Sequence, residues 1–175
     1  SRLMMALLFA GFNFFLGPMR YHENYEYIKY SEQFEEVLVE FWLLGDSRQY
    51  KEGGLQKQRI GSPYDLILTV HNRFEGAKSI TMENLDLDGV ETPLEMEFSS
   101  VYTEEFPADS PPGHENALAG VVVERLDIPY QDYRVSFSLT VEYEDKMYYH
   151  DVSGILLRNY SEKETRARAD NLGDL

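Results

Sequence analysis

The chain has 175 residues, of which 31 are acidic and 16 basic, so its formal net charge is −15. Hydrophobic residues make up 43% of the chain, which is enough for one domain with its own core and argues against a wholly disordered protein. Nucleic-acid binding needs clustered Lys and Arg to neutralise phosphates, so the acidic excess excludes a general nucleic-acid-binding protein. Because no cysteine is present, disulfides, zinc–thiolate sites and iron–sulfur clusters are excluded as well.

The N-terminal segment is uncharged over residues 3–19, which read LMMALLFAGFNFFLGPM between Arg2 and Arg20. A helix of that length spans roughly 25 Å, close to the roughly 30 Å of a bilayer core. The next ten residues contain four tyrosines, as in the aromatic belt at a membrane surface: Tyr21, Tyr25, Tyr27 and Tyr30. We therefore expect residues 1–20 to form a hydrophobic helix that anchors the chain in a membrane. The alternatives are a signal peptide and a buried helix or strand that packs on the core.

The remaining chain has the period-two hydrophobicity of β-strands. Apolar and polar residues alternate over 133–143, a turn at 144–145 follows, and 133–157 therefore predicts a β-hairpin. The other strand candidates are short runs separated by Gly, Pro, Asn and Asp: 25–30, 34–44, 64–71, 79–87, 94–102 and 118–126. The run 34–44 also fits an amphipathic helix, but its Val, Phe and Trp residues favour a strand.

Seven or eight such strands predict an all-β fold, an antiparallel immunoglobulin-like β-sandwich over residues 21–160 with an N-terminal hydrophobic helix. A β-barrel uses the same alternation and is the alternative. The tail 161–175, SEKETRARADNLGDL, has almost no apolar face, so we expect a short frayed helix or a disordered tail there.

The segment 126–135, LDIPYQDYRV, resembles the corner that leads into strand F of fibronectin type III domains. In that corner a tyrosine packs its ring inside the domain and its hydroxyl bonds back to the chain. The resemblance implies that Tyr133 has this role, that Ile128 and Val135 belong to the core, and that Pro129 starts the turn. It also implies an immunoglobulin-like sandwich and, by analogy of fold alone, an adhesive or interaction role.

Two segments are the candidates for contacts with a partner. The segment 48–59, RQYKEGGLQKQR, reads as a flexible loop with a basic cluster: Arg48, Lys51, Lys57 and Arg59. The segment 106–114 begins FPADSPPG and reads as a semi-rigid projecting loop with three prolines: Pro107, Pro111 and Pro112.

One motif has partial metal-binding chemistry. Asn84, Asp86, Asp88 and Glu95, with Gly89 at the sixth position, match much of an EF-hand calcium loop. The alternative, which we favour, is a strand that buries Leu85 and Leu87 and ends at an Asp-Gly turn. The four histidines lack metal-ligand spacing and no G-x-S-x-G motif is present, so we nominate no catalytic residue, metal ligand or cofactor.

These observations predict a non-catalytic, membrane-anchored β-sandwich that acts as a protein-interaction or assembly subunit of a membrane-associated complex. We expect its body on the extracytoplasmic side, periplasmic or extracellular, with no nucleic-acid partner. The alternatives are a protein that binds a small apolar ligand or lipid, and a carbohydrate-active hydrolase with a carboxylate pair. An interaction module predicts an apolar patch or an open strand edge on the folded surface.

Overall fold

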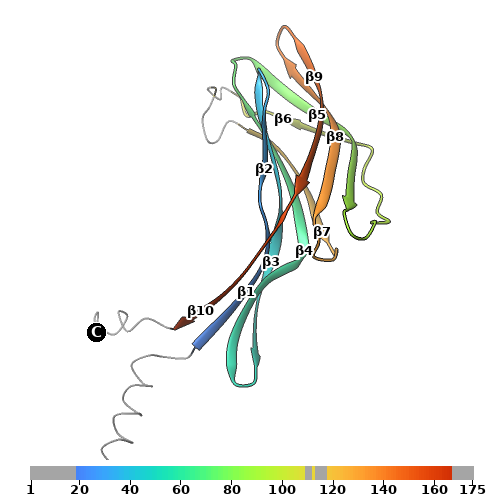
Figure 1. Cartoon of the computed structure of the whole chain (residues 1–175). Coiled ribbons are helices and arrows are strands. Elements are labelled where there is room, and N and C mark those ends of the chain that lie inside the picture. Colours follow the sequence, from blue (N-terminus) through green and yellow to red (C-terminus); the bar gives the residue numbers. More distant parts are fainter. Residues whose placement is uncertain (1–18, 109–111, 113–117, 167–175) are drawn as a thin grey trace, which may run out of the picture.

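The computed structural model describes residues 19–108, 112 and 118–166, and this part of the chain is all-β with no helix (Figure 1). Its strands are β1 (Met19–Tyr27), β2 (Tyr30–Gln33), β3 (Val37–Glu52), β4 (Leu55–Asn72), β5 (Ala77–Gly89), β6 (Val101–Glu105), β7 (Leu118–Leu126), β8 (Tyr133–Tyr143), β9 (Met147–Leu156) and β10 (Arg158–Arg166).

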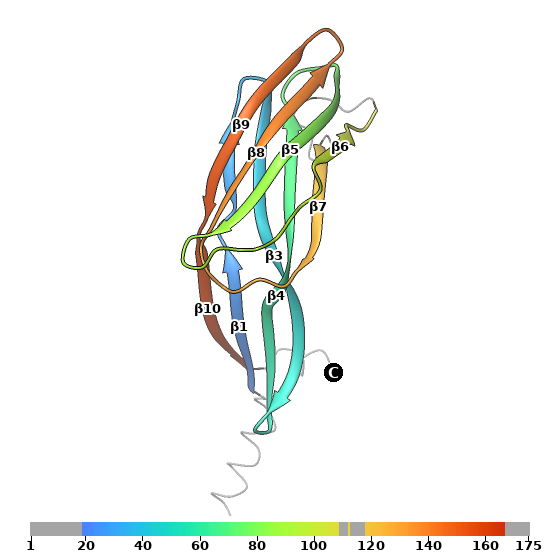
Figure 2. The same ribbon diagram turned by 90° about the vertical axis from the view of Figure 1, so that its right-hand side faces the viewer.

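The strands form two sheets that face each other (Figure 2). Sheet A has the order β10-β1-β4-β3-β2, and β7 pairs with the Tyr64–His71 part of β4. Sheet B has the order β6-β5-β8-β9. Every pairing is antiparallel except that of β1 with β4, which is parallel. The predicted all-β, antiparallel-rich architecture is therefore confirmed, and two facing sheets are consistent with a sandwich.

The core lies between the two sheets because each central strand buries alternate side chains. In β8 every second residue from Tyr133 to Tyr143 is buried, as the sequence alternation predicted. Phe41 of β3 meets Phe137 of β8 across the interface, with ring centroids 6.0 Å apart. Each buried side chain of this size contributes about 1.5–3 kcal/mol to stability, so the sheet-to-sheet contact is the main source of the fold's stability.

The corner before β8 has the geometry expected from the sequence. The Tyr133 hydroxyl donates a hydrogen bond to the carbonyl of Pro129, four residues upstream, and the ring is fully buried. Ile128 and Val135 are buried beside it. The buried hydroxyl is thereby satisfied, and it fixes the path of the chain from β7 into β8.

Sheet A continues past the end of sheet B (Figures 1 and 2). The four segments beyond this point are Met19–Asn24, Asp46–Glu52, Leu55–Ile60 and Ser161–Arg166, which we call the extension. It begins where the register of β3 and β4 shifts between Gly45 and Asp46. A Cβ at Gly45 would lie 3.0 Å from the backbone of Gly61, so the two strands approach closely there. Within the described residues no sheet faces the extension, and its side chains are accordingly mostly polar and exposed on both faces.

Three expectations fail in the described residues. Residues 161–166 were expected to be helical or disordered, but they belong to β10, because β1 supplies a backbone partner to each of them. Of the strand candidate 94–102, only Val101 and Tyr102 are in a strand. Leu94 and Phe98 pack on the core without a strand partner, so the apolar residues of this segment indicate burial and not strand pairing. The segment 48–59 is not a loop, as described below.

The predicted N-terminal helix and the end of the tail lie outside the described residues, which leave out 1–18 and 167–175. Met19 and Arg20, which were assigned to the anchor, are the first residues of β1. Among the described residues there is no helix with the length and apolar character needed to span a membrane. The ambiguity at 34–44 is settled in favour of a strand, since β3 begins at Val37.

Candidate interaction surfaces

The predicted basic loop is the distal end of a long hairpin. Strands β3 and β4 continue through residues 48–59 in unbroken register, and only Gly53 and Gly54 form the turn. Both glycines have positive φ, 58° and 76°, which is the conformation that a tight two-residue hairpin turn requires. The four basic side chains are therefore held on strands and not on a flexible loop.

The hairpin separates these four cations onto opposite faces. Side chains alternate along a strand, and residues paired across strands share a face. Arg48 is paired with Arg59, and Lys57 lies two residues from Arg59, so these three share one face. Lys51 is paired with Gln56 and lies on the other face. The structure therefore does not bring the four predicted residues together as one basic patch.

The face with three cations also carries aromatic and acidic side chains, and we call it the tyrosine face. The Lys57 ammonium donates to Glu52 at 3.1 Å, which raises the Lys57 pKa, and it lies 5.7 Å from the Tyr21 ring centroid. Arg59 lies 4.6 Å from the Tyr25 ring centroid, and Arg48 is 3.6 Å from Asp46. The cations of the tyrosine face are therefore already occupied by partners within the chain.

A tyrosine–carboxylate cluster occupies the β1–β10 side of the tyrosine face. The Tyr160 hydroxyl donates to Glu162, and its ring packs 4.8 Å from that of Tyr25. A hydrogen bond to Glu162 raises the pKa of Tyr21 to about 12. Conversely, the hydroxyls of Tyr160 and Tyr21 lower the pKa of Glu162. This cluster ties β10 to β1 through side chains as well as through the backbone ladder.

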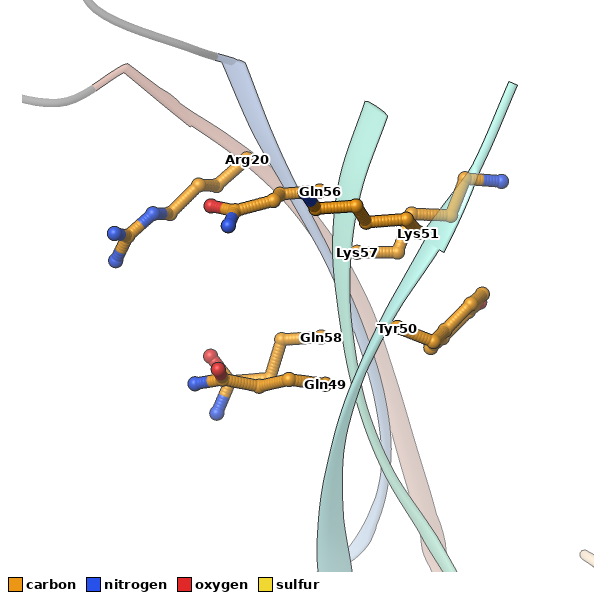
Figure 3. Close-up of a pocket in the computed structure, with 7 residues that line it drawn as sticks. All are labelled: Arg20, Gln49, Tyr50, Lys51, Gln56, Lys57 and Gln58. Atoms are coloured by element: carbon orange, nitrogen blue, oxygen red, sulfur yellow. The ribbon is translucent and has the colours of Figure 1, made fainter. Parts of the chain in front are cut away.

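The opposite face of the extension carries amides and cations, and we call it the amide face (Figure 3). Figure 3 shows Arg20, Gln49, Gln56 and Gln58 on one side of the hairpin and Tyr50 on the other. Register places Lys51 beside Gln56, and Gln56 beside Arg20. A hollow of about 420 Å³ is lined by residues of which none is acidic: Arg20, Gln49, Tyr50, Lys51, Gln56, Lys57 and Gln58. Five of them belong to the amide face, whereas Tyr50 and Lys57 belong to the tyrosine face.

The proline segment lies at the other end of the sandwich from the extension (Figure 2). Phe106 is buried, and its amide donates to the carbonyl of Lys78 at 2.9 Å, so the start of the segment is fixed to β5. Pro107 is exposed and Pro112 is half-buried, whereas Pro111 lies outside the described residues. The two predicted contact segments therefore do not form one surface.

Sequence reasoning missed an apolar row on the outer face of sheet A. Trp42 of β3, Ile67 of β4 and Val122 of β7 are paired side by side across three strands. Val122 is 50% exposed, as is Leu44, at 51%, two residues along β3 from Trp42. Lys29 lies 5.5 Å from the Trp42 ring centroid. The signal was present in the sequence, because β3 is apolar at both its inward and several of its outward positions.

A buried polar pair closes the core at the end remote from the extension. Glu36 is fully buried, and its carboxylate contacts the Nε2 atom of His150, on whose ring Phe34 stacks at 4.0 Å. The Glu36 backbone carbonyl accepts a hydrogen bond from the Tyr143 hydroxyl at 2.7 Å. These contacts link the start of β3 to β8 and β9, and their role is structural.

Other sites considered from the sequence find little support in the described part of the chain. Asn84, Asp86 and Asp88 lie within strand β5 and not in a calcium-binding loop, and Leu87 is buried as the strand alternative predicted. No group of three or more His, Asp or Glu side chains is placed to hold a metal ion among these residues. The cavity between the sheets has a volume of about 10 Å³, which is too small for an apolar ligand.

Comparisons with protein-family models, with curated proteins and with solved structures give no match for this chain.

Proposed function

We propose that the protein is a non-catalytic β-sandwich, anchored to a membrane through residues 3–19, whose body binds a protein partner on the extracytoplasmic side. The observation that carries this proposal is the apolar row of Trp42, Ile67 and Val122, with Leu44 beside it, on the solvent face of sheet A. The sequence expectation for an interaction module was an exposed patch of this kind.

The composition of the row suits a protein interface. Tryptophan is among the residues most enriched at interface hot spots, and Trp42 is the single tryptophan of the chain. It is flanked by aliphatic side chains and by Lys29 on a surface of three paired strands, whose backbone is fixed by the sheet, so little backbone entropy is lost when a partner covers them.

The surroundings of the row define the partner's chemistry. Asp65 is paired with Leu44, and Glu124 lies two residues from Val122, so acidic side chains stand at the margin of the row. The whole chain has a net charge of −15. We therefore expect a partner surface with an apolar centre and a basic rim, because charge complementarity speeds association and selects partners.

The strand order supports the immunoglobulin-like reading of the fold. When β3–β9 are taken in chain order as seven strands, the first, second and fifth share sheet A, and the third, sixth and seventh share sheet B. This is the division of strands A, B, E and C, F, G in immunoglobulin-type sandwiches. The fourth strand, β6, departs from the constant-type arrangement because it pairs with the third strand instead of the fifth.

A site-specific crosslink tests the partner hypothesis in the native membrane. A photoreactive phenylalanine analogue at position 122 of the full chain is expected to give one adduct of defined mass, which Trp42→Ala reduces at least tenfold because the row is a single contact surface. The matched control is the analogue at position 149 on the outer face of sheet B, where Tyr149 is 71% exposed.

Unchanged melting temperatures for the variants establish that the fold is intact. Equal adducts at positions 122 and 149, or an adduct that Trp42→Ala does not change, would contradict the proposal.

A further inference from the structure

We propose that the amide face of the extension is a docking site for the phosphate-bearing headgroups of anionic membrane lipids. This inference rests on the proposed membrane anchor and deepens it, since it names the surface that meets the bilayer. Its first basis is the hollow of about 420 Å³ on the extension, to whose lining the amide face contributes two cations and three amides and no carboxylate: Arg20, Lys51, Gln49, Gln56 and Gln58.

Charge is unevenly distributed along the molecule, which the net charge of the whole chain does not show. The extension contains 7 of the 16 basic residues but only 5 of the 31 acidic ones, so it is slightly positive while the rest of the chain is strongly negative. An acidic body is repelled by an anionic bilayer, whereas a basic end is attracted to it. The molecule therefore has one end that suits such a surface.

Within the extension, the strand register places all five carboxylates on the tyrosine face. Glu23 and Glu162 are paired there, Glu164 is paired with Tyr21, Glu52 bonds to Lys57, and Asp46 approaches Arg48. The amide face receives Arg20 and Lys51 on one row, and Lys163 on the next through its pairing with His22. Its cations therefore face no acidic neighbour on the same surface.

Arg20 and Lys51 are available to a ligand. Both are exposed, and neither forms an ion pair or a hydrogen bond with another side chain in the part of the chain that the structure describes. By contrast, Lys57 is bound to Glu52, although it lies on the same hairpin. Guanidinium, ammonium and amide N–H groups are the donors that phosphate oxygens accept.

The amide donors are held in place by the sheet. The Gln58 side chain donates to the Ser47 hydroxyl at 3.0 Å, and Asn24 donates to the Ser161 hydroxyl at 3.3 Å. These bonds bridge neighbouring strands on the amide face and orient its polar groups before a ligand arrives. A preorganised donor set loses less entropy on binding than a flexible loop does.

The sequence next to this face is the reason that we assign the occupant as a lipid headgroup and not as a soluble anion. Arg20 follows directly on residues 3–19, which carry no charge and are rich in Leu, Met and Phe. An apolar segment is therefore directly adjacent in the chain to the cationic amide face.

The absence of cysteine from the 175 residues allows a direct test on the whole of this chain. Gln49→Cys, labelled with a fluorophore, reports on the amide face in vesicles that contain a headgroup-nitroxide lipid as quencher. The anionic test vesicles contain phosphatidylcholine with 30% phosphatidylglycerol, and the neutral ones contain phosphatidylcholine alone. We expect quenching of the fluorophore in the anionic vesicles and much less in the neutral ones. We expect the double variant Arg20→Gln/Lys51→Gln to lower the ratio of docked to undocked extension by about 30-fold. An assay buffer with 0.5 M salt should lower this ratio to a similar extent, because salt screens the attraction.

The matched control removes two charges from the same hairpin but from the tyrosine face. Lys57→Gln/Arg59→Gln has the same change in net charge, and we expect less than about a threefold effect because both side chains are already partnered. Equal losses in the two double variants, or equal quenching in neutral and anionic vesicles, would overturn the headgroup assignment. Displacement by millimolar inorganic phosphate would show a soluble-anion site instead.

Flotation of the full chain separates this inference from the anchor on which it rests. Flotation with neutral vesicles reports on residues 3–19, whereas the fluorophore reports on the amide face. A chain that fails to float with neutral vesicles but is quenched in anionic ones contradicts the anchor and retains the headgroup site. A chain that floats with neutral and with anionic vesicles, but is quenched equally in the two, supports the anchor and overturns the headgroup site.

Discussion

At the scale of single residues, a buried amide organises the turn that follows β5. The Gln131 side chain is 2% exposed and accepts hydrogen bonds from the backbone amides of Glu91, at 3.0 Å, and Thr92, at 2.8 Å. It also donates to the carbonyl of Thr92 at 2.9 Å. One side chain thus satisfies three partly buried backbone groups that lie outside the strand ladders.

Gly89 makes this arrangement sterically possible, and its substitution is the first prediction. A Cβ at Gly89 would lie 1.9 Å from the Thr92 carbonyl oxygen and 2.3 Å from the Gln131 side-chain nitrogen. Gly89→Ala therefore has to displace the amide and break its bonds, and we expect a loss of about 3 kcal/mol in the free energy of unfolding. Urea denaturation of the variant measures this loss.

Gly120→Ala is the matched control for this substitution. Its nearest contacts would be at 3.6 and 3.7 Å, which is ordinary van der Waals distance, so we expect a change below about 0.5 kcal/mol. A Gly89→Ala protein as stable as Gly120→Ala would mean that the turn rearranges freely and that Gln131 does not hold it.

At the scale of elements, the extension differs from the sandwich in how it is stabilised. Its strands have backbone pairing on both sides of β1 and β4, but no second sheet covers either face. Hydrophobic burial, the dominant stabilising contribution elsewhere, is therefore small here. Backbone hydrogen bonds, ring contacts and the tight turn at Gly53 and Gly54 have to hold it, so we expect it to open locally at a lower free energy than the sandwich.

The turn provides the second prediction. Gly53→Ala/Gly54→Ala places two Cβ atoms at positive φ, which costs about 1–2 kcal/mol per residue, although nothing within 4 Å obstructs them. We expect faster hydrogen exchange of the amides over 49–58 and an almost unchanged melting temperature. If the melting temperature instead falls in proportion to the local loss, the extension unfolds together with the sandwich and is not an independent element.

The elements also show what sequence alone predicts and what it does not. The hairpin of β8 and β9 was predicted because β8 alternates strictly and buries one face, and the strand β7 was predicted because it is a short apolar run between turn residues. The extension was not, because a sheet without a facing layer is polar on both sides and therefore has the composition of a loop, as in RQYKEGGLQKQR. The separation of Lys51 from Arg48, Lys57 and Arg59 depends on register, which composition does not contain.

The outer apolar row follows the same logic. Trp42 and Leu44 were recognised as strand residues, but whether they share a row with Ile67 and Val122 depends on the pairing of β3, β4 and β7. The tyrosine corner was recognisable because its residues are neighbours in sequence: Tyr133 and its acceptor carbonyl are four positions apart. Local geometry is thus encoded in short patterns, whereas surfaces made by several strands require the topology.

At the scale of the whole molecule, buried tyrosines connect the strands and corners. Three buried tyrosines, Tyr64, Tyr133 and Tyr143, and two half-buried ones, Tyr27 and Tyr130, donate their hydroxyls to backbone carbonyls at other positions of the chain. Burial raises the pKa of each of these phenols above its ordinary value of 10.0. Ionisation would remove the donor and leave a buried phenolate against a carbonyl oxygen.

This arrangement makes alkaline pH the condition that weakens the whole fold. Below pH 10 the tyrosines are protonated in both the folded and the unfolded chain, so their contribution to stability is fully present. Above pH 10 the unfolded chain releases protons that the folded chain retains, and stability falls as pH rises toward the folded-state pKa values. Each such tyrosine adds about 1.4 kcal/mol per pH unit to this fall.

The third prediction isolates one of these residues. Tyr64→Phe removes a hydroxyl that bonds to the Tyr25 carbonyl at 2.8 Å, so we expect a loss of about 1 kcal/mol at pH 8. The assay covers pH 10 to 11. Over this range the free energy of unfolding of the variant should fall less steeply than that of the parent protein, and the two slopes should differ by about the contribution of one tyrosine. Urea midpoints measured across this range, with Tyr149→Phe as an exposed-site control at pH 8, provide both quantities. Parallel pH profiles for Tyr64→Phe and the parent would mean that Tyr64 ionises equally easily in both states, and the alkaline loss would then have to come from the other groups that titrate in this range, the remaining tyrosines and the lysines.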